Sequence, residues 1–215
     1  MDIVLASRNK KKIAELKNII ESCGFSGNDA AVNIHTPDEF PHCEEVEEDG
    51  ATFEANAIKK AAYIFKCSGM TSVADDSGLE VDALDGAPGV FSARYAGEEA
   101  GDRANLEKLL REMNGVPDEK RGARFVCNIA LATKDGVKTF TGYVEGSIGT
   151  VPRGTKGFGY DPVFFPEGHD RTFAEMSDNE KSSMSHRGRA LRELQGYLKE
   201  QGLIGSGDSS KNHLS

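Results

Sequence analysis

Near its middle the chain reads Thr71-Ser72-Val73-Ala74-Asp75-Asp76-Ser77-Gly78-Leu79. The small and β-branched residues at its start predict a short buried strand that ends at two carboxylates, a hydroxyl and a glycine. Adjacent carboxylates repel each other and are poor core material. Open α/β sheets bind ligands at the carboxyl ends of their strands, so one interpretation is an acidic binding site. The alternative is a polar turn between two strands.

The N-terminal segment predicts a strand followed at once by a helix. Residues 2–6 are apolar, and apolar residues then recur at helical spacing from Ile13 until Gly24, where we expect the helix to end. The residues between them are Ser7, Arg8, Asn9, Lys10, Lys11 and Lys12. A strand-to-helix turn is an anion site, whereas lysines at a helix N-terminus are unfavourable for the helix alone. A bound polyphosphate would remove that conflict, and a solvated basic face is the alternative.

A proline-containing, acidic segment precedes the next predicted helix. Residues 25–51 predict a loop that includes the acidic run 44–49. Such a run is usually a solvated surface, but one of its acids could reach a metal ion. Thr52 then predicts the N-cap of a helix that ends near Gly69.

The remainder of the chain predicts a mixed sheet with flanking helices. Residues 79–83 alternate as a half-exposed strand, residues 87–95 predict a loop beside the acidic turn, and Asp102 is a candidate helix cap. Two long antiparallel strands follow, with Gly142 and Gly146 as candidate bulges. Later elements are a short strand at 163–165, a capping box from Ser177, and a last helix from Ser185. We expect one domain over residues 1–204 and a disordered tail over 205–215.

A glycine-rich loop at residues 151–162 carries exposed aromatic candidates. Phe158 and Tyr160 stand beside Gly157 and Gly159, which offer no cover to their rings. An aromatic ring on such a close-approach backbone is a good platform for stacking a nucleotide base. The alternative is a loop that packs its aromatic rings onto the core.

Composition limits the classes of function. The chain has 215 residues, 28% charged and 38% hydrophobic, which is the balance of a soluble globular protein. Its net charge of −9 argues against binding to a nucleic-acid backbone. We see no signal peptide and no run of about 18 apolar residues, so we expect no membrane span and a cytoplasmic location. The cysteines lack metal-binding spacing and are expected to be free thiols: Cys23, Cys43, Cys67 and Cys127.

These segments together resemble one family. The motifs that carry the resemblance, in order, are Ser7–Lys12, Glu48–Phe53 with Asn56-Ala57, Asp75–Leu79, Gly86–Gly89 with Ser92–Tyr95, Gly157–Pro162, Glu180-Lys181 and Ser185–Arg187. They are similar to the inosine triphosphate pyrophosphatase family in its RdgB/HAM1-like branch, over residues 3–198. One departure is Lys156, where the family usually has a second glycine.

The resemblance implies a fold and a reaction. The fold is an elongated, twisted mixed α/β sheet flanked by helices, with two lobes around a central nucleotide cleft. The reaction is hydrolysis of inosine and xanthosine triphosphates, in ribo and deoxy forms, to the monophosphate and pyrophosphate, which removes deaminated purines from the nucleotide pool. Mg²⁺ and a homodimer are also implied.

The resemblance and the residue chemistry together assign the site. Asp76 is the predicted catalytic acid, and Glu48 and Asp76 are the predicted Mg²⁺ ligands, with Glu47 and Asp49 as open alternatives to Glu48. Asp75 is expected to be a supporting residue, because neighbouring residues of a strand point to opposite sides. The predicted substrate contacts are Ser7, Arg8, Asn9, Lys10, Lys11, Lys12, Ser77, Phe158, Gly159, Tyr160, Asp161, Lys181, His186 and Arg187.

Within that set the sequence suggests separate roles. Lys12 and Lys181 are assigned to the phosphates, and Lys10 and Lys11 are expected to be solvated, because the motif fixes only the last lysine. Phe158 is the candidate ring for base stacking. Arg187 carries only donors, so it would pair with the C6 oxygen of hypoxanthine or xanthine and not with the amino group of adenine. For His186 and Arg187 the alternative is simple polarity at a helix start.

Three other functions remain as alternatives. One is a pyrophosphatase for modified pyrimidine or standard nucleotides. A second is a non-catalytic nucleotide-binding protein, which would not need the metal carboxylates. A third is an RNA-binding protein that uses the lysines, and it conflicts with the acidic charge balance.

Overall fold

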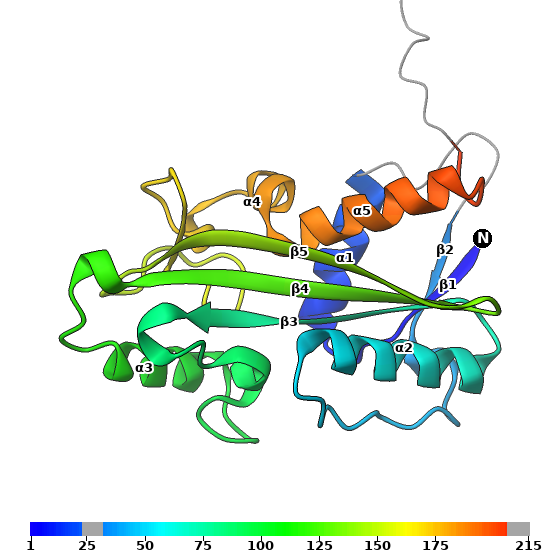
Figure 1. Cartoon of the computed structure of the whole chain (residues 1–215), viewed down its shortest axis with the longest axis horizontal. Coiled ribbons are helices and arrows are strands. Elements are labelled where there is room, and N and C mark those ends of the chain that lie inside the picture. The colour runs from blue at the N-terminus through cyan, green and yellow to red at the C-terminus, as the bar shows by residue number, and fades with distance from the viewer. Residues whose placement is uncertain (23–31, 206–215) are drawn as a thin grey trace, which may run out of the picture.

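One twisted mixed sheet forms the framework of the molecule. The computed structural model describes residues 1–22 and 32–205. In this part the sheet has six strands in the order β2-β1-β3-β4-β5-β6 (Figure 1). Their bounds are β1 (Asp2–Leu5), β2 (Asn33–His35), β3 (Ser72–Val81), β4 (Gly122–Thr133), β5 (Gly136–Ile148) and β6 (Phe164–Pro166). β1 is parallel to β2 and β3, and the remaining pairs are antiparallel, so the predicted mixed sheet is confirmed.

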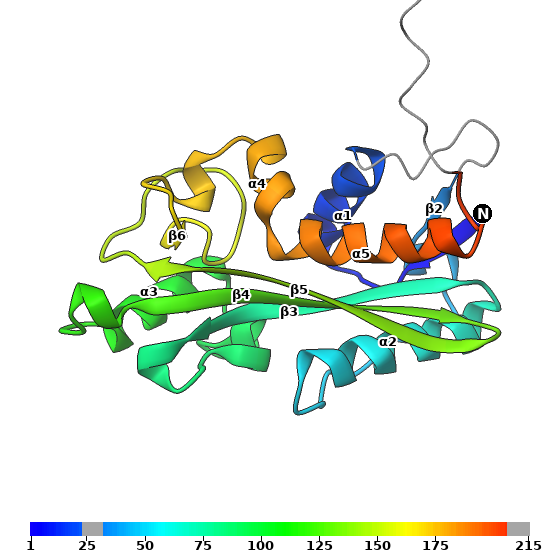
Figure 2. The same cartoon turned by 45° about the horizontal axis from the view of Figure 1, so that its top comes forward.

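Helices cover both faces of this elongated sheet. They are α1 (Lys10–Ser22), α2 (Phe53–Ser68), α3 (Asp102–Glu112), α4 (Asp178–Met184) and α5 (His186–Glu200). α2 runs along one face, and α1, α4 and α5 lie on the other (Figure 2). The predicted caps are confirmed at Thr52, Gly69, Ser177 and Ser185, whereas the cap before α3 is Gly101 and not Asp102.

Alternation along the strands separates the two faces. Larger side chains such as Leu5, Val73 and Ile129 pack under α1 and α5. Their strand neighbours Ala74 and Ala130 pack under α2. Small side chains on that face let α2 approach the sheet closely. A third apolar cluster forms beyond Leu79, around α3, β6 and the loops near them. The apolar clusters at the two ends of the sheet correspond to the two predicted lobes, and the acidic stretch lies between them.

β3 is longer than the sequence predicted. It runs without interruption through residues 72–81, so Asp75 and Asp76 lie in the middle of a strand and not at its end. β4 pairs with β3 along this whole length. On the other side β1 pairs only with the start of β3, at Ser72 and Val73. The two acids are therefore beside the carboxyl end of β1, where the parallel part of the sheet stops.

Two glycines of the sheet, Gly142 and Gly78, lie where another part of the chain approaches closely. The β4–β5 register continues through Gly142 and Gly146, so the predicted bulges are wrong. A Cβ atom at Gly142 would lie 2.2 Å from the carbonyl oxygen of His186 in α5. At Gly78 in β3 a Cβ atom would lie 2.3 Å from the Ser92 hydroxyl, which confirms that the loop 87–95 packs beside the acidic stretch.

Three further expectations have clear outcomes. Cys43 and Cys67 form a disulfide, so the prediction of free thiols is wrong for this pair, while Cys127 is a buried free thiol. β2 lies within the segment predicted to be a loop. No helix among residues 1–22 and 32–205 is long and apolar enough to cross a membrane. Cys23, the predicted helix end at Gly24 and residues 206–215 of the predicted tail lie outside the described residues.

Candidate active site

Asp75 and Asp76 point to opposite faces of β3. Asp75 shares its face with Val73 and contacts groups from α1 and α5, whereas Asp76 shares its face with Ala74 and contacts α2. Both are nearly inaccessible to solvent, at 1% and 4% exposure. Two carboxylates buried this deeply need separate sets of partners.

Asp76 belongs to a cluster that joins β3, α2 and the acidic loop. Asn56 donates a hydrogen bond from Nδ2 to Asp76 Oδ2 at 3.0 Å. The buried ammonium of Lys60, one turn further along α2, lies 3.3 Å from Asp76 Oδ1 and 2.5 Å from Glu48 Oε1. Lys60 also donates to the carbonyl oxygen of Asp75 at 2.7 Å. The two predicted metal ligands, Glu48 and Asp76, thus converge on one cation.

The acidic loop presents Glu48 to this cluster and its neighbours to solvent. Glu47 and Asp49 are exposed, and Asp49 pairs with Lys59 at the surface. The backbone carbonyl of Glu48 accepts a hydrogen bond from Arg94 at 2.9 Å, which fixes the loop against the segment after β3. Among the three acids left open by the sequence, Glu48 is the one that reaches Asp76 through Lys60.

The electrostatics of the two carboxylates differ. Burial raises the pKa of Asp76 above its ordinary value, and the positive charge of Lys60 does not fully offset this. Burial is also the largest single influence on Glu48 and acts to raise its pKa, but the charge and hydrogen bond of Lys60, together with the charge of Lys12, outweigh it and the pKa is lowered. The pKa of Lys60 is raised: burial opposes this, but the charges of Asp76 and Glu48 outweigh it. Asp76 is therefore the more basic carboxylate of the pair.

Asp75 is held in a separate ionic network. Arg187 donates from Nε to Asp75 Oδ2 at 3.1 Å, and the Lys12 ammonium lies 3.6 Å from the same oxygen. Burial would raise the pKa of Asp75, but Lys12 and Arg187 together lower it strongly. Arg187 also donates to Ser77 Oγ at 2.6 Å and to Glu15 Oε2 at 2.8 Å. Asp75 is thus a buried, ionised carboxylate whose partners are separate from those of Asp76.

The glycine-rich loop adds an aromatic ring to this network. Lys181 lies 5.1 Å and the Arg187 guanidinium 5.4 Å from the centre of the Phe158 ring. Asp161 holds the loop, because its carboxylate accepts from the Phe158 backbone N–H at 2.8 Å and from Lys181 at 2.6 Å. Lys181 also pairs with Glu15 at 3.3 Å. Phe158, Lys181 and Arg187 therefore form one cluster, with Asp161 as its buried support.

The N-terminal turn lines a cavity next to the acids. Asn9 Oδ1 accepts hydrogen bonds from the backbone N–H groups of Lys11 and Lys12, and so caps the start of α1. The turn borders a cavity of about 140 Å³. Its other walls come from the acidic loop and α2. The polar and charged residues that line it include Ser7, Arg8, Asn9, Lys12, Glu48 and Lys60.

Several predicted contacts lie elsewhere. The Tyr160 side chain is buried and its hydroxyl donates to the carbonyl of Ser92, so it supports the core. Lys10 is exposed, and Lys11 pairs with Asp102 of α3 at 2.6 Å. His186 is buried and stacked on Phe125, with ring centres 4.8 Å apart. Lys181 is absent from the lining of the 140 Å³ cavity and belongs to the Phe158 cluster.

Three residues of the site were given no role from the sequence, although one of them, Asn56, belongs to a motif that carries the family resemblance. Lys60 and Asn56 lie on the helix that the sequence predicted, on its buried face between apolar residues. Glu15 lies on α1 and links Arg187 with Lys181. Polar residues on the apolar face of a predicted helix are a usable signal, because such groups need partners when buried. Asn56, one residue before Ala57, and Lys60, one before Ala61, carry this signal.

The fold and the site define a class of protein. An α/β structure places Glu48, the buried Lys60 and the lysine-bearing start of α1 around one cavity. Asp76 lies behind this wall on Lys60, and Asp75 links Lys12 to the aromatic–arginine cluster. Carboxylates suit a hard divalent cation, and cations at a helix start suit phosphate groups. This is the composition expected of a site for a phosphorylated ligand.

Comparison with known proteins identifies the family. The model of the Ham1 family matches residues 3–197, and the chain belongs to this family. It is 48% identical to the dITP/XTP pyrophosphatase of Geobacter sulfurreducens over 202 residues, which are 94% of this chain and 98% of that protein. It is 49% identical to the dITP/XTP pyrophosphatase of Mycobacteroides abscessus, over 90% of this chain and 93% of that protein.

Solved structures agree with this assignment. A HAM1 protein from Coxiella burnetii superposes with a TM-score of 0.82 at 41% identity, covering 93% of this chain and 99% of that one. The Ham1 protein of Staphylococcus aureus gives a TM-score of 0.81 at 41% identity, covering 94% and 100%. The family resemblance and the fold expected from it are both confirmed.

Proposed function

We propose that this chain is a nucleoside triphosphate pyrophosphatase that hydrolyses inosine and xanthosine triphosphates, including the deoxy forms, to the monophosphate and pyrophosphate. The relatives named dITP/XTP pyrophosphatase support the substrate class. The observation that carries the proposal is the convergence of Glu48 and Asp76 on Lys60 at a cavity lined by Lys12. A protein that only bound nucleotides would have no need of this buried pair of carboxylates.

A divalent cation fits the carboxylates. Glu48 and Asp76 share one ammonium partner, so their oxygens lie near a common point that already holds positive charge. Carboxylate oxygens are the protein ligands that Mg²⁺ takes, and one or two are enough. We propose that Glu48 and Asp76 hold Mg²⁺. When bound, the ion would neutralise phosphate charge and polarise the reacting phosphoryl group.

The protein's own groups supply the rest of the reaction. In this proposal, water attacks the α-phosphorus and pyrophosphate leaves, and Asp76 accepts the proton of the attacking water. In the metal-free protein burial raises the pKa of Asp76, which is the direction that favours proton acceptance. Lys12 binds the phosphates, with Ser7, Arg8 and Asn9 of the N-terminal turn beside it at the cavity wall. Positioning and charge neutralisation are the main contributions to such phosphoryl chemistry.

The Phe158 cluster is the proposed site for the base. Phe158 offers a ring for stacking, with Lys181 and Arg187 close to that ring. Each nitrogen of Arg187 already donates one hydrogen bond, and the two terminal nitrogens each have a second N–H. Those N–H groups can meet the C6 oxygen of hypoxanthine or xanthine. In the proposal Lys181 therefore acts nearer the base than the sequence suggested.

The test is a steady-state assay of pyrophosphate release with inosine, xanthosine, guanosine and adenosine triphosphates, with and without Mg²⁺. We expect turnover of the first two to exceed that of adenosine triphosphate by at least about a hundredfold, and to need the metal. Equal turnover of all four, or faster turnover of a modified pyrimidine triphosphate added to the panel, would contradict the substrate class. Arg187→Ala is expected to narrow the inosine-to-adenosine ratio.

A homodimer and a cytoplasmic location complete the proposal. The homodimer comes from the family resemblance, and the cytoplasmic location is the expectation drawn from the sequence. Light scattering of the purified protein checks the first, and fractionation of cells that produce it checks the second.

A further inference from the structure

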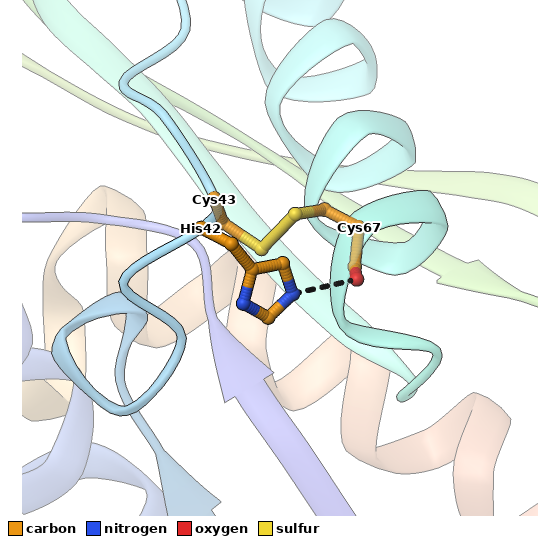
Figure 3. A group of neighbouring side chains, drawn as sticks. All are labelled: His42, Cys43 and Cys67. Carbon is orange, nitrogen blue, oxygen red and sulfur yellow. Dashed lines mark hydrogen bonds between the residues drawn. A yellow bond between two sulfur atoms is a disulfide. The ribbon is translucent and has the colours of Figure 1, made fainter.

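A disulfide lies at the start of the acidic loop, directly before the acidic run 44–49. Cys43 in that loop is bonded to Cys67 in the last turn of α2 (Figure 3). His42 lies beside the pair, with its Nε2 atom 3.2 Å from the carbonyl oxygen of Cys67. One ring nitrogen of His42 and the two sulfur atoms all lie within 4.8 Å of one another. The proposed function assigns no role to these three side chains.

The disulfide joins the two elements that meet at the cavity. The segment 37–48 supplies Pro37, Glu44, Glu45, Val46 and Glu48 to the cavity wall. α2 supplies Lys60, two turns before Cys67. The disulfide therefore fastens the loop that carries Glu48 to the helix that carries Lys60, at a point away from the cavity itself.

A second contact extends this fastening to the N-terminal turn. Arg8 donates from Nη2 to the carbonyl oxygen of Cys43 at 2.8 Å, and from Nη1 to Asp38 at 3.2 Å. Arg8 is itself part of the cavity wall. The backbone of Cys43 is thus a junction between the acidic loop, α2 and the turn that bears Lys12.

We propose that Cys43–Cys67 is a reversible thiol–disulfide modification site that controls the position of the acidic loop and so the affinity of the cavity for its ligand. The co-reactant is a dithiol reductant. One of its thiolates attacks a sulfur of the disulfide, the Cys43–Cys67 bond breaks and a mixed disulfide forms. The second thiolate of the reductant then closes its own disulfide, and the protein is left with two thiols after it takes up two protons.

The surroundings favour attack at Cys67. Cys43 is fully buried, whereas Cys67 is partly exposed and His42 is exposed. An external thiolate therefore reaches the Cys67 sulfur, and Cys43 is the leaving group. A neighbouring imidazole favours a thiolate over a thiol, so His42 makes the reduced pair a competent nucleophile for the reverse exchange, in which the oxidised, disulfide form of the co-reactant takes up the two electrons and returns to a dithiol.

The structural part is tested by hydrogen–deuterium exchange on the full chain before and after treatment with dithiothreitol. We expect reduction to raise exchange of the backbone amides in residues 40–48 by roughly tenfold, with β3 and β4 unchanged. Peptide mapping without reductant should show residues 43 and 67 linked, and reduction should add two hydrogens. Absence of the link, or exchange in residues 40–48 that is the same in both states, would overturn the proposal.

The second arm measures pyrophosphate release and rests on the proposed function. We expect reduction to raise KM for deoxyinosine triphosphate by roughly fivefold, about 1 kcal/mol of binding free energy, with kcat little changed. Cys67→Ser should show the raised KM in both states, and Cys127→Ala should keep the response to reductant. A KM that reduction leaves unchanged would overturn the control of affinity. If the oxidised protein released no pyrophosphate, the proposed function would be wrong. The hydrogen-exchange experiment would still test whether the disulfide holds residues 40–48 in place.

Discussion

At the scale of single residues, the site depends on the alternation of side chains along β3. Asp75 and Asp76 are neighbours in the sequence, yet one contacts Arg187 and Lys12 and the other contacts Asn56 and Lys60. The first pair of cations keeps Asp75 ionised as a structural anion. The second environment leaves Asp76 with a raised pKa and beside Lys60, which lines the cavity. The same residue type therefore meets two different environments at adjacent positions.

Substitution of each aspartate by asparagine separates these roles. Asp76→Asn is expected to lower kcat by about a thousandfold, because it removes the proposed base, with a small change in the urea midpoint. Asp75→Asn is expected to lower the free energy of unfolding by about 3 kcal/mol, because it leaves buried cations without their anion. Parallel activity and urea-denaturation measurements check both. Near-normal turnover of Asp76→Asn would exclude Asp76 as the base that accepts the proton of the attacking water.

Lys60 offers a second prediction at this scale. Lys60→Met removes the cation between Glu48 and Asp76, so the two buried carboxylates repel each other without relief. We expect kcat to fall by about a hundredfold, and Mg²⁺ to bind the free protein more tightly because the ammonium no longer competes with it. The matched control is Lys59→Met, whose ammonium pairs with Asp49 at the surface. Calorimetric titration with Mg²⁺ that gave equal affinity for both variants would contradict this competition.

The site residues predicted from the sequence and those that were missed lie in different kinds of sequence pattern. Lys12, Glu48 and Asp76 lie in polar stretches that interrupt the apolar pattern, so the sequence singled them out. Lys60 and Glu15 sit among residues with helical periodicity, and their role appears only when two helices face the sheet. A pattern along one element does not show which charges from other elements will meet it. Ion pairs between different elements are therefore the part of a site that a single sequence does not predict.

At the scale of elements, the contact between β5 and α5 sets the position of the basic residues at the start of α5. Gly142 lets the backbone of α5 lie directly against the strand, because a Cβ atom there would be 2.2 Å from His186 O and 2.5 Å from Ala190 N. Arg187 follows His186 immediately and reaches Asp75 across the sheet face. A shift of α5 would therefore move Arg187 away from Asp75 and Ser77.

Gly142→Ala tests this contact. We expect a loss of about 2 kcal/mol in the free energy of unfolding, because the methyl group meets backbone atoms and not a flexible side chain. Gly196→Ala in α5 is the control. Gly196 is exposed with open space around it, so this substitution should raise the free energy of unfolding by about 0.5–1 kcal/mol through helix propensity. Urea denaturation measures both. A neutral Gly142→Ala would mean that α5 can move without cost.

Element prediction succeeded where periodicity and caps agree. α2 with Thr52 and Gly69, and the hairpin of β4 and β5, follow from patterns within one segment. The length of β3 did not follow, because two aspartates and a glycine are unfavourable in an isolated strand. In the folded protein β4 pairs along all of β3, and buried cations from α1, α2 and α5 compensate the two acids. Tertiary contacts therefore override the local preference in this stretch.

At the scale of the whole molecule, the buried charges link the site to the dependence of stability on pH. His186 is buried among cationic groups, and burial together with the charges of Arg187 and Lys181 lowers its pKa well below 6.5. It is therefore neutral in the folded protein near neutral pH. His35 at the sheet edge has the opposite shift, because its hydrogen bonds to Glu39 and Asp2 raise its pKa. The two histidines act in opposite directions as the pH falls.

The slope of stability against pH can isolate His186. Its folded-state pKa lies below its unfolded value, so below about pH 6.5 the unfolded chain binds a proton that the folded protein does not. The stability that His186 contributes is complete above that pH and is lost on acidification, at up to about 1.4 kcal/mol per pH unit. His186→Phe keeps a ring against Phe125 but cannot bind the proton, so its free energy of unfolding should fall less steeply between pH 6.5 and 5. His169→Gln, at an exposed position, should keep the original slope. The effect of His35 is common to all three proteins and cancels in the differences, so equal slopes for His186→Phe and the parent would show that His186 binds its proton equally in both states.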